Sequence, residues 1–161
     1  MEQDHRYRIQ TTWTGDLGRG TETFRGYARD HETSSDGRPP LLASSDPSFR
    51  GDPARWNPEL LLVAALSQCH MLWFLHLASV NGVVVTGYVD EAEGVMRETS
   101  DGGGHFVEVV LRPAVTLTDA DMIERAESLH EVASGRCFIA NSVNFPVHHE
   151  AKTRVGEHTG V

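Results

Sequence analysis

Two cysteines, Cys69 and Cys137, are the residues of this chain best suited to covalent chemistry. A thiolate is a nucleophile that can be oxidised, and two thiols from separate segments can form a transient disulfide. Cys69 lies in a long apolar stretch, where a cysteine is often only a small buried apolar residue. Gln68 and His70 flank it, however, and polar side chains in an apolar helix need partners or a cleft. A redox pair and structural coincidence both fit these residues.

Other common catalytic and ligand-binding patterns are missing. The chain has nine histidines, but no His-x-x-x-His or Cys-x-x-Cys pair gives the ligand spacing of a zinc site. It has no Gly-x-Ser-x-Gly elbow and no glycine-rich phosphate-binding loop, so neither a hydrolase nor a nucleotide-binding protein is indicated. We expect no metal ion, and a zinc-dependent protein is the weakest alternative.

The size and charge of the chain limit its possible partners. Its 161 residues fit one domain, so we expect a single domain over residues 1–161. Fourteen basic against 23 acidic residues give a formal charge of −9, which repels nucleic acid and anionic membranes. The charged segment 1–8 has no apolar core typical of a secretory signal. We therefore expect a cytoplasmic protein with no nucleic-acid or membrane partner.

The first cysteine lies within a long helix predicted over residues 57–81. Asn57 can cap free amides, Pro58 suits the first helical position, and Glu59 lies favourably at the positive end of the helix dipole. Gly82 is expected to end the helix. Apolar residues cover nearly its whole circumference, so the helix should be enclosed on all sides. A chain of this size can hardly do that alone, and the helix therefore predicts a partner subunit.

Shorter elements are predicted on either side of this helix. Residues 7–14 and 21–27 predict an N-terminal hairpin, and the polar, proline-rich segment 29–56 predicts a long loop. A capping signature at Thr118 and regularly spaced apolar residues predict a second helix ending at Gly135. Cys137 would then lie at the start of a short helix, whose dipole favours a thiolate. The other predicted strands cover 83–88, 94–99, 105–117 with Pro113 at an edge or bulge, and 143–147. This order indicates an α+β fold.

Three motifs follow one another along almost the whole chain. They are Trp13-x-Gly15 with Gly20-Thr21, then Asn57-Pro58-Glu59-Leu60 followed by Ala64-Ala65-x-x-x-Cys69, and then Cys137-x-Ile139-x-Asn141. In their order and spacing, from about residue 7 to residue 147, the chain resembles the OsmC/Ohr family of thiol peroxidases. The resemblance implies an OsmC-like α+β fold with antiparallel sheets around a long buried central helix. It also implies an intertwined homodimer with two sites at the subunit interface.

The resemblance further implies an activity and a role for each cysteine. Family members reduce organic hydroperoxides in the oxidative stress response through a redox-active cysteine pair. A small or lipoyl dithiol recycles the pair, with no metal, haem or flavin cofactor. By motif position, Cys69 is the peroxidatic residue, which forms a sulfenic acid, and Cys137 is the resolving residue, which closes a disulfide with it. In the family an arginine held by a glutamate keeps the thiolate ionised. The glutamate corresponds to Glu59, and Arg50 is our choice for the arginine.

Alternatives to these assignments remain at two points. Arg19 and Arg55 are the next candidates after Arg50 for this arginine, because the segment 29–56 is longer than in the family and aligns only with a gap. His70 also stands where several members have Phe, so the chain resembles a divergent branch. The rival function is a non-catalytic module of the same fold that binds an apolar small molecule at the dimer interface. It predicts the two sulfurs far apart, whereas a peroxidase needs them within reach of each other.

Overall fold

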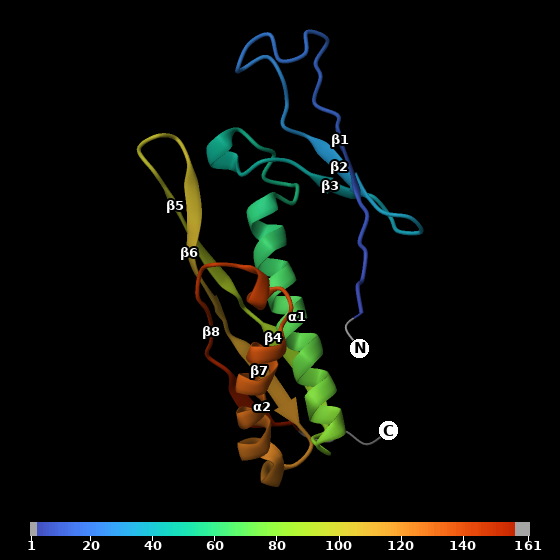
Figure 1. The fold of residues 1–161 in the computed structure, drawn as a ribbon, viewed down its shortest axis with the longest axis vertical. Coiled ribbons are helices and arrows are strands. Elements are labelled where there is room, and N and C mark those ends of the chain that lie inside the picture. The colour runs from blue at the N-terminus through green and yellow to red at the C-terminus, as the bar shows by residue number, and fades with distance from the viewer. Residues whose placement is uncertain (1–2, 157–161) are drawn as a thin grey trace. The chain divides into compact units, whose positions relative to one another are not determined.

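The computed structural model describes residues 3–156 and divides into two units, Met1–Leu62 and Val63–Val161. The long helix α1 (Pro58–Val80) begins in the first unit and continues through the second (Figure 1). Each unit has its own sheets. A single domain over residues 1–161 stays a prediction.

A small antiparallel sheet forms the body of the first unit. It contains β1 (Gln10–Trp13), β2 (His31–Ser34) and β3 (Leu41–Ala43), in the order β1-β2-β3. A single 3₁₀ turn, η1 (Pro47–Phe49), follows, with the Asp46 carboxylate accepting a hydrogen bond from the Ser48 amide at its start. The elements after β1 are only three or four residues long, which agrees with a segment rich in proline.

Residues 21–27 form turns and not the second strand of the predicted hairpin, so that prediction was wrong. The Arg29 guanidinium is the physical reason. It donates to the carbonyl oxygens of Phe24 and Tyr27, at 2.8 and 2.7 Å, and lies over both aromatic rings. These carbonyls are therefore committed to the guanidinium and cannot join a strand ladder. β1 pairs with β2 instead, inside the segment that we expected to be a loop.

The helix α1 begins and ends as predicted. The Asn57 side-chain oxygen accepts a hydrogen bond from the Leu60 amide at 2.8 Å, which confirms the N-cap. Gly82, with a φ of 70°, ends the helix in the left-handed conformation, and the Val83 amide closes the last turn on the Ala78 carbonyl. Within the described residues, α1 is the one helix long and apolar enough to span a membrane, a test that core helices of soluble proteins also pass.

Two three-stranded sheets form the second unit. One contains β4 (Val85–Asp90), β7 (Pro113–Leu117) and β9 (Lys152–Val155), and the other contains β5 (Glu93–Glu98), β6 (Gly104–Leu111) and β8 (Val147–His149). Their orders are β4-β7-β9 and β5-β6-β8. Each sheet combines one antiparallel pair with one parallel pair, because β8 and β9 run alongside β6 and β7. The α+β class predicted from the sequence is confirmed.

The predicted strand 105–117 is in fact two strands in different sheets. Arg112 separates them, with its amide donating to the Asp90 carboxylate at 2.6 Å. Pro113 then begins β7, where its missing N–H interrupts the ladder. It is fully buried, and β7 is the middle strand of its sheet, so the prediction of an edge or a bulge at Pro113 was wrong. The predicted last strand at 143–147 lies later, as the edge strand β8, and β9 was not predicted.

The second helix, α2 (Ile123–Arg136), lies near the lower half of α1 in Figure 1 and confirms the periodicity found in the sequence. A 3₁₀ turn, η2 (Ala120–Met122), precedes it, with the Asp119 carboxylate accepting from the Asp121 amide. A shared core of residues from both helices and from β7 holds α2 in place. Its fully or nearly buried members are Phe74, Leu77, Ala78, Val83, Val115, Leu117, Ala126, Leu129 and Ala133.

Candidate active site

Cys69 lies in the middle of α1 and is half-buried. Residues three, four and seven positions further along a helix share one face with the first. Leu72, Trp73 and His76 therefore lie on the same side of α1 as Cys69. These three residues line a shallow concavity of about 280 Å³. The thiol thus lies on a helix face that carries a mostly apolar hollow.

Cys137 directly follows α2 and is 1% exposed. Its amide bonds to the Ser134 carbonyl, and its sulfur accepts a hydrogen bond from the Ala140 amide at 3.4 Å. The expected position at a helix N-terminus was wrong, because α2 runs through Gly135 to Arg136 and is followed only by a 3₁₀ turn, η3 (Ala140–Ser142). A helix C-terminus is negative and does not favour a thiolate, but hydrogen bonds from the Ala140 and Ile139 amides act in the opposite direction and lower the pKa of the Cys137 thiol.

The structure brings the two cysteines together. Burial first, and then the interaction with the Cys69 side chain, raises the pKa of the Cys137 thiol to about 11. Such an interaction requires the two thiols to be neighbours. Cys137 therefore stays protonated at neutral pH, and Cys69 faces it from α1.

Two aromatic rings connect the segments that carry the thiols. Trp73, one turn after Cys69, meets Phe138, the neighbour of Cys137, with ring centroids 5.5 Å apart in an edge-to-face arrangement. The Arg136 guanidinium carbon lies 5.8 Å from the Trp73 ring centroid. The sequence analysis singled out neither ring. Their positions in the sequence could have indicated this contact, because Trp73 lies one helical turn after Cys69 and Phe138 directly follows Cys137.

His70 follows Cys69 in the sequence but takes no part in a thiol–imidazole pair. Its Nε2 atom lies 3.0 Å from Nδ1 of His130 on α2, and both side chains are buried. The sequence analysis did not single out His130, since one histidine on an amphipathic helix has no distinctive spacing.

Two of the arginine candidates are exposed side chains of the first unit. Arg50 follows η1 in a left-handed conformation, with φ of 69°, and its guanidinium carbon lies 5.8 Å from the Phe24 ring centroid. Arg19 pairs with Glu22 at 2.6 Å. Both thiols belong to the second unit, so the role of Arg50 stays a prediction.

Arg55 and Glu59, also in the first unit, have buried polar atoms without partners. The Arg55 guanidinium lies 3.5 Å from the Asp30 carboxylate and 3.6 Å from that of Asp52, yet its Nη1 atom is buried with no hydrogen bond to any described residue. The Oε2 atom of Glu59 is likewise buried without a partner in residues 3–156. Unpaired buried groups of this kind are costly and are typical of incomplete sites.

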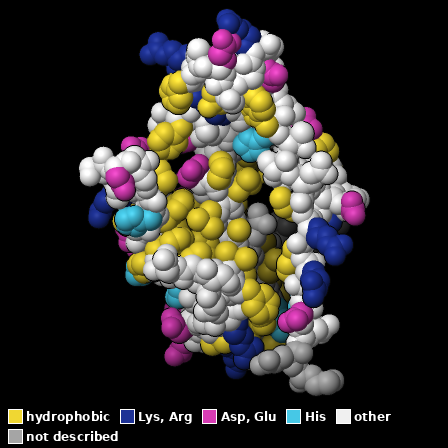
Figure 2. Space-filling model, turned by 45° about the horizontal axis from the view of Figure 1, so that its top comes forward, with side chains coloured by type: hydrophobic (Ala, Val, Ile, Leu, Met, Phe, Trp, Pro, Cys, Tyr) yellow, Lys and Arg dark blue, Asp and Glu magenta, His cyan; other side chains and the backbone are white. Residues whose placement is uncertain are grey.

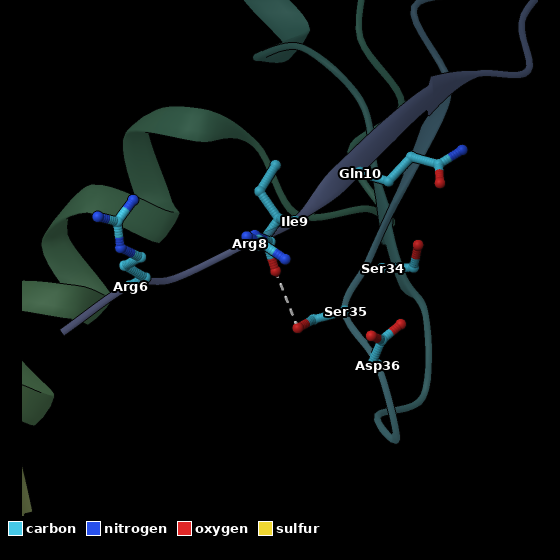
Figure 3. Close-up of a pocket in the computed structure, with 7 residues that line it drawn as sticks. All are labelled: Arg6, Arg8, Ile9, Gln10, Ser34, Ser35 and Asp36. Carbon is cyan, nitrogen blue, oxygen red and sulfur yellow. Dashed lines mark hydrogen bonds between the residues drawn. The ribbon is translucent and has the colours of Figure 1, made fainter.

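A larger concavity, of about 520 Å³, lies in the first unit between the N-terminal segment and β2 (Figure 3). Its lining residues are Arg6, Arg8, Ile9, Gln10, Ser34, Ser35 and Asp36. Figure 3 shows the Ser35 hydroxyl donating to the Arg8 carbonyl, at 3.1 Å. This lining contains no cysteine, so the thiol chemistry belongs to the surroundings of Cys69 and not to this concavity.

Across the part of the chain that the structure describes, no group of three or more His, Cys, Asp or Glu side chains is arranged to hold a metal ion. The strongest reactive grouping is therefore the thiol pair.

Comparison with known proteins identifies similar sequences and folds. The family described as OsmC-like protein matches residues 51–152. An OsmC-like protein of unknown function from Vibrio cholerae is 35% identical, with a TM-score of 0.80 over 92% of this chain and 100% of that one. No curated protein sequence matches significantly.

Two more distant structures share the fold. An organic hydroperoxide resistance protein from Elizabethkingia anophelis is 20% identical, with a TM-score of 0.66 over 96% of this chain and 100% of that one. An organic hydroperoxide resistance protein from Legionella pneumophila is 18% identical, with a TM-score of 0.64 over the same shares. At these identities the likeness concerns the fold.

Proposed function

The chain belongs to the OsmC-like protein family, and from this premise we propose that it is a thiol-dependent peroxidase that reduces organic hydroperoxides. The observation that carries the proposal is the neighbouring position of the Cys69 and Cys137 segments, given by the contact between the Trp73 and Phe138 rings and by the interaction between the two thiols. The names of the Elizabethkingia and Legionella relatives, organic hydroperoxide resistance proteins, favour the same substrate class. The rival, a non-catalytic module, predicts separated sulfurs and is disfavoured by this arrangement.

Three steps make up the proposed reaction. The Cys69 thiolate attacks the outer oxygen of the hydroperoxide, the O–O bond breaks, and the alkoxide takes up a proton and leaves as an alcohol. Cys69 is then a sulfenic acid. The Cys137 sulfur attacks the Cys69 sulfur, forming a disulfide, and the hydroxyl leaves with a proton as water. A small or lipoyl dithiol then reduces the disulfide by two exchange steps.

The apolar surroundings of Cys69 favour a hydroperoxide with an apolar body. Leu72 and Trp73 line the hollow on the Cys69 face, and Phe138 packs on Trp73. Burying apolar surface in such a hollow stabilises binding by about 25 cal/mol per Å². Hydrogen peroxide gains nothing from this contact, so it should be the poorer substrate.

A cation is needed to keep a half-buried thiolate ionised. Arg50 remains the sequence-based choice, with Glu59 as the carboxylate that holds the arginine. Arg55 is the strongest alternative, since it is half-buried beside two carboxylates and retains an unused donor. The proposed reaction requires no cofactor, because the protein's own side chains carry out its steps.

We further propose a cytoplasmic homodimer. α1 is apolar on all sides, yet in the single chain Leu60, Leu72 and Val80 are 50%, 62% and 64% exposed. Figure 2 shows hydrophobic side chains open at the surface of the molecule. A second copy of the chain would cover such residues.

Peroxide consumption tests the proposal directly. With cumene hydroperoxide and a dithiol in excess, the wild-type protein should turn over continuously and Cys69→Ser should fall to the uncatalysed rate. Cys137→Ser should turn over more slowly than wild type, because its sulfenic acid can react only with the dithiol from solution and not with a neighbouring thiol. Ser128→Ala, an exposed change on α2, serves as control. Wild-type turnover no faster than that of Cys69→Ser would reject the function.

The same assay identifies the arginine. Arg50→Ala, Arg55→Ala and Arg19→Ala are compared at equal protein concentration. Loss of the cation that supports the thiolate should slow the first step by roughly a hundredfold, as removal of a transition-state donor typically does. Wild-type rates in all three variants would exclude these arginines as the cation that supports the Cys69 thiolate.

A further inference from the structure

We propose that the hydrogen bond between His70 and His130 positions the two thiol-bearing segments, so that Cys137 is held beside Cys69. The proposal rests on the Cys69–Cys137 pair of the proposed function and adds two positioning residues to it. His70 directly follows Cys69 on α1, and His130 lies on α2, seven residues before Cys137. Both imidazoles are 1% exposed, so the bond forms away from solvent.

The geometry of the pair is that of a directional contact. Nε2 of His70 and Nδ1 of His130 are 3.0 Å apart, the ring planes are within 5° of parallel, and the centroids are 5.3 Å apart. These values describe two rings joined edge to edge, in nearly one plane, by an N–H···N bond. Either ring can donate, depending on the tautomers. Such a bond tolerates little misalignment, so it fixes one helix against the other.

Phe74 holds the His130 ring from a second direction. It lies one turn beyond His70 on α1, and its ring stacks on His130 with a centroid separation of 4.1 Å and an interplanar angle of 9°. α1 therefore contacts the His130 imidazole at two places: His70 bonds to its edge, and Phe74 stacks on its face. This arrangement restricts both sliding of α2 along α1 and tilting of the ring.

The remaining contacts of α2 with this core are apolar and do not select one register. Ala126, Leu129 and Ala133 are the buried α2 residues of the shared core, and hydrophobic contact has no directional preference. Cys137 moves with α2, because it directly follows the helix and its amide donates to the carbonyl of Ser134 in the last turn. A displacement of about 1 Å can slow a positioned reaction by roughly a hundredfold. The histidine bond thus controls how often the thiols meet.

Further side chains surround this bond. His149 of β8 packs on both imidazoles, with centroids 5.5 and 6.0 Å away, and its Nε2 atom lies 3.4 Å from the Glu131 carboxylate. Nε2 of His130 is buried with no hydrogen-bond partner within residues 3–156. Only the Nδ1 side of His130 is therefore used. Asparagine places a polar atom near the Nδ1 position, and glutamine places one near the Nε2 position.

Thiol–disulfide equilibrium with glutathione measures this positioning without any peroxide. The reduced protein and one glutathione disulfide give the intramolecular disulfide and two glutathione thiols, so electrons and protons balance. His130→Leu should lower the equilibrium constant for the Cys69–Cys137 disulfide by roughly tenfold or more, because misplaced groups react far less well. His130→Asn should stay close to wild type. Mass spectrometry of trapped thiols gives the oxidised fraction.

Matched variants separate positioning from stability. Leu129→Ala removes a buried apolar side chain of the same helix, lowers the thermal unfolding temperature, and should leave the equilibrium constant unchanged. The proposal is overturned if the equilibrium constant for the disulfide falls equally in Leu129→Ala and His130→Leu. It is also overturned if this constant does not fall in His130→Leu. If His130→Leu does not fold, His130→Gln replaces it, and equal constants for His130→Gln and His130→Asn overturn the proposal.

The experiment also distinguishes this inference from the proposed function. A wild-type protein that forms the disulfide with glutathione but does not consume peroxide refutes the peroxidase and leaves the positioning role supported by the variants. A wild-type protein that forms no such disulfide refutes the positioning role itself.

Discussion

Burial gives the two thiols different chemistry. Cys137 is 1% exposed, and its pKa is raised to about 11 by burial and by its interaction with Cys69. It keeps its proton at neutral pH and is therefore the poorer first nucleophile of the two. Its proton is useful in the second step, since the hydroxyl of a sulfenic acid leaves as water. Cys69, half-buried on the face with the apolar hollow, is the thiol that a hydroperoxide can reach.

The buried imidazoles should make the fold sensitive to acid. Burial, together with neighbouring imidazoles, lowers the pKa of His70 to about 4 and that of His130 to about 3, while Asp90 partly opposes the shift at His70. The unfolded chain takes up these protons near pH 6.5. Stability is therefore complete above about pH 6.5 and falls as the pH drops toward 4, by at most about 1.4 kcal/mol per pH unit for each histidine.

Urea unfolding between pH 7 and pH 5, at fixed protein concentration, measures this loss. The double variant His70→Gln, His130→Asn cannot take up the two protons and should lose less stability than wild type over this range. His148→Gln, at an exposed histidine, should behave like wild type. The same pH slope in the double variant as in wild type would contradict the expectation.

The first turn of α1 depends on one side chain. The Asn57 side-chain oxygen accepts a hydrogen bond from the Leu60 amide, so Asn57→Ala leaves this amide without its acceptor. We expect a loss of about 1 kcal/mol in the free energy of unfolding. Asn57→Ser retains an oxygen that can accept this bond and should lose less. Equilibrium unfolding in urea compares the two, and equal losses would show that the cap contributes nothing.

Helices were more predictable than strands, for a physical reason. The signals for α1 are local, since a cap, an N-terminal proline and a terminal glycine all act within one turn of the helix ends. Strand pairing is not local. The pattern at 21–27 suits a strand, but the Arg29 guanidinium binds the carbonyls of this segment. Likewise, nothing within 105–117 shows that the Asp90 carboxylate accepts a hydrogen bond from the Arg112 amide and so divides the predicted strand in two.

The candidate site was predictable to the extent that it lies on regular elements. Cys69 and Cys137 are attached to helices whose ends the sequence marks, and the structure makes them neighbours. His130 and Phe138 contribute through contacts between distant segments, which one sequence does not reveal. Arg50 belongs to an irregular segment of the first unit, where no periodicity constrains the side chain. Its assignment therefore still depends on the peroxide assay.

The whole molecule presents more apolar surface along α1 than one chain covers, and this predicts a stable dimer. Light scattering at micromolar concentration should give a mass near twice the 17.8 kDa of the chain. Leu72→Glu places a charge where Leu72 is 62% exposed, which costs a free monomer little but would bury an unpaired charge in an interface. We therefore expect Leu72→Glu to shift the protein toward monomer. Val132→Glu, at a residue of α2 that is 41% exposed, is the matched control and should remain dimeric. A wild-type mass of one chain would contradict the dimer, and dissociation by both variants alike would show that α1 is not the contact.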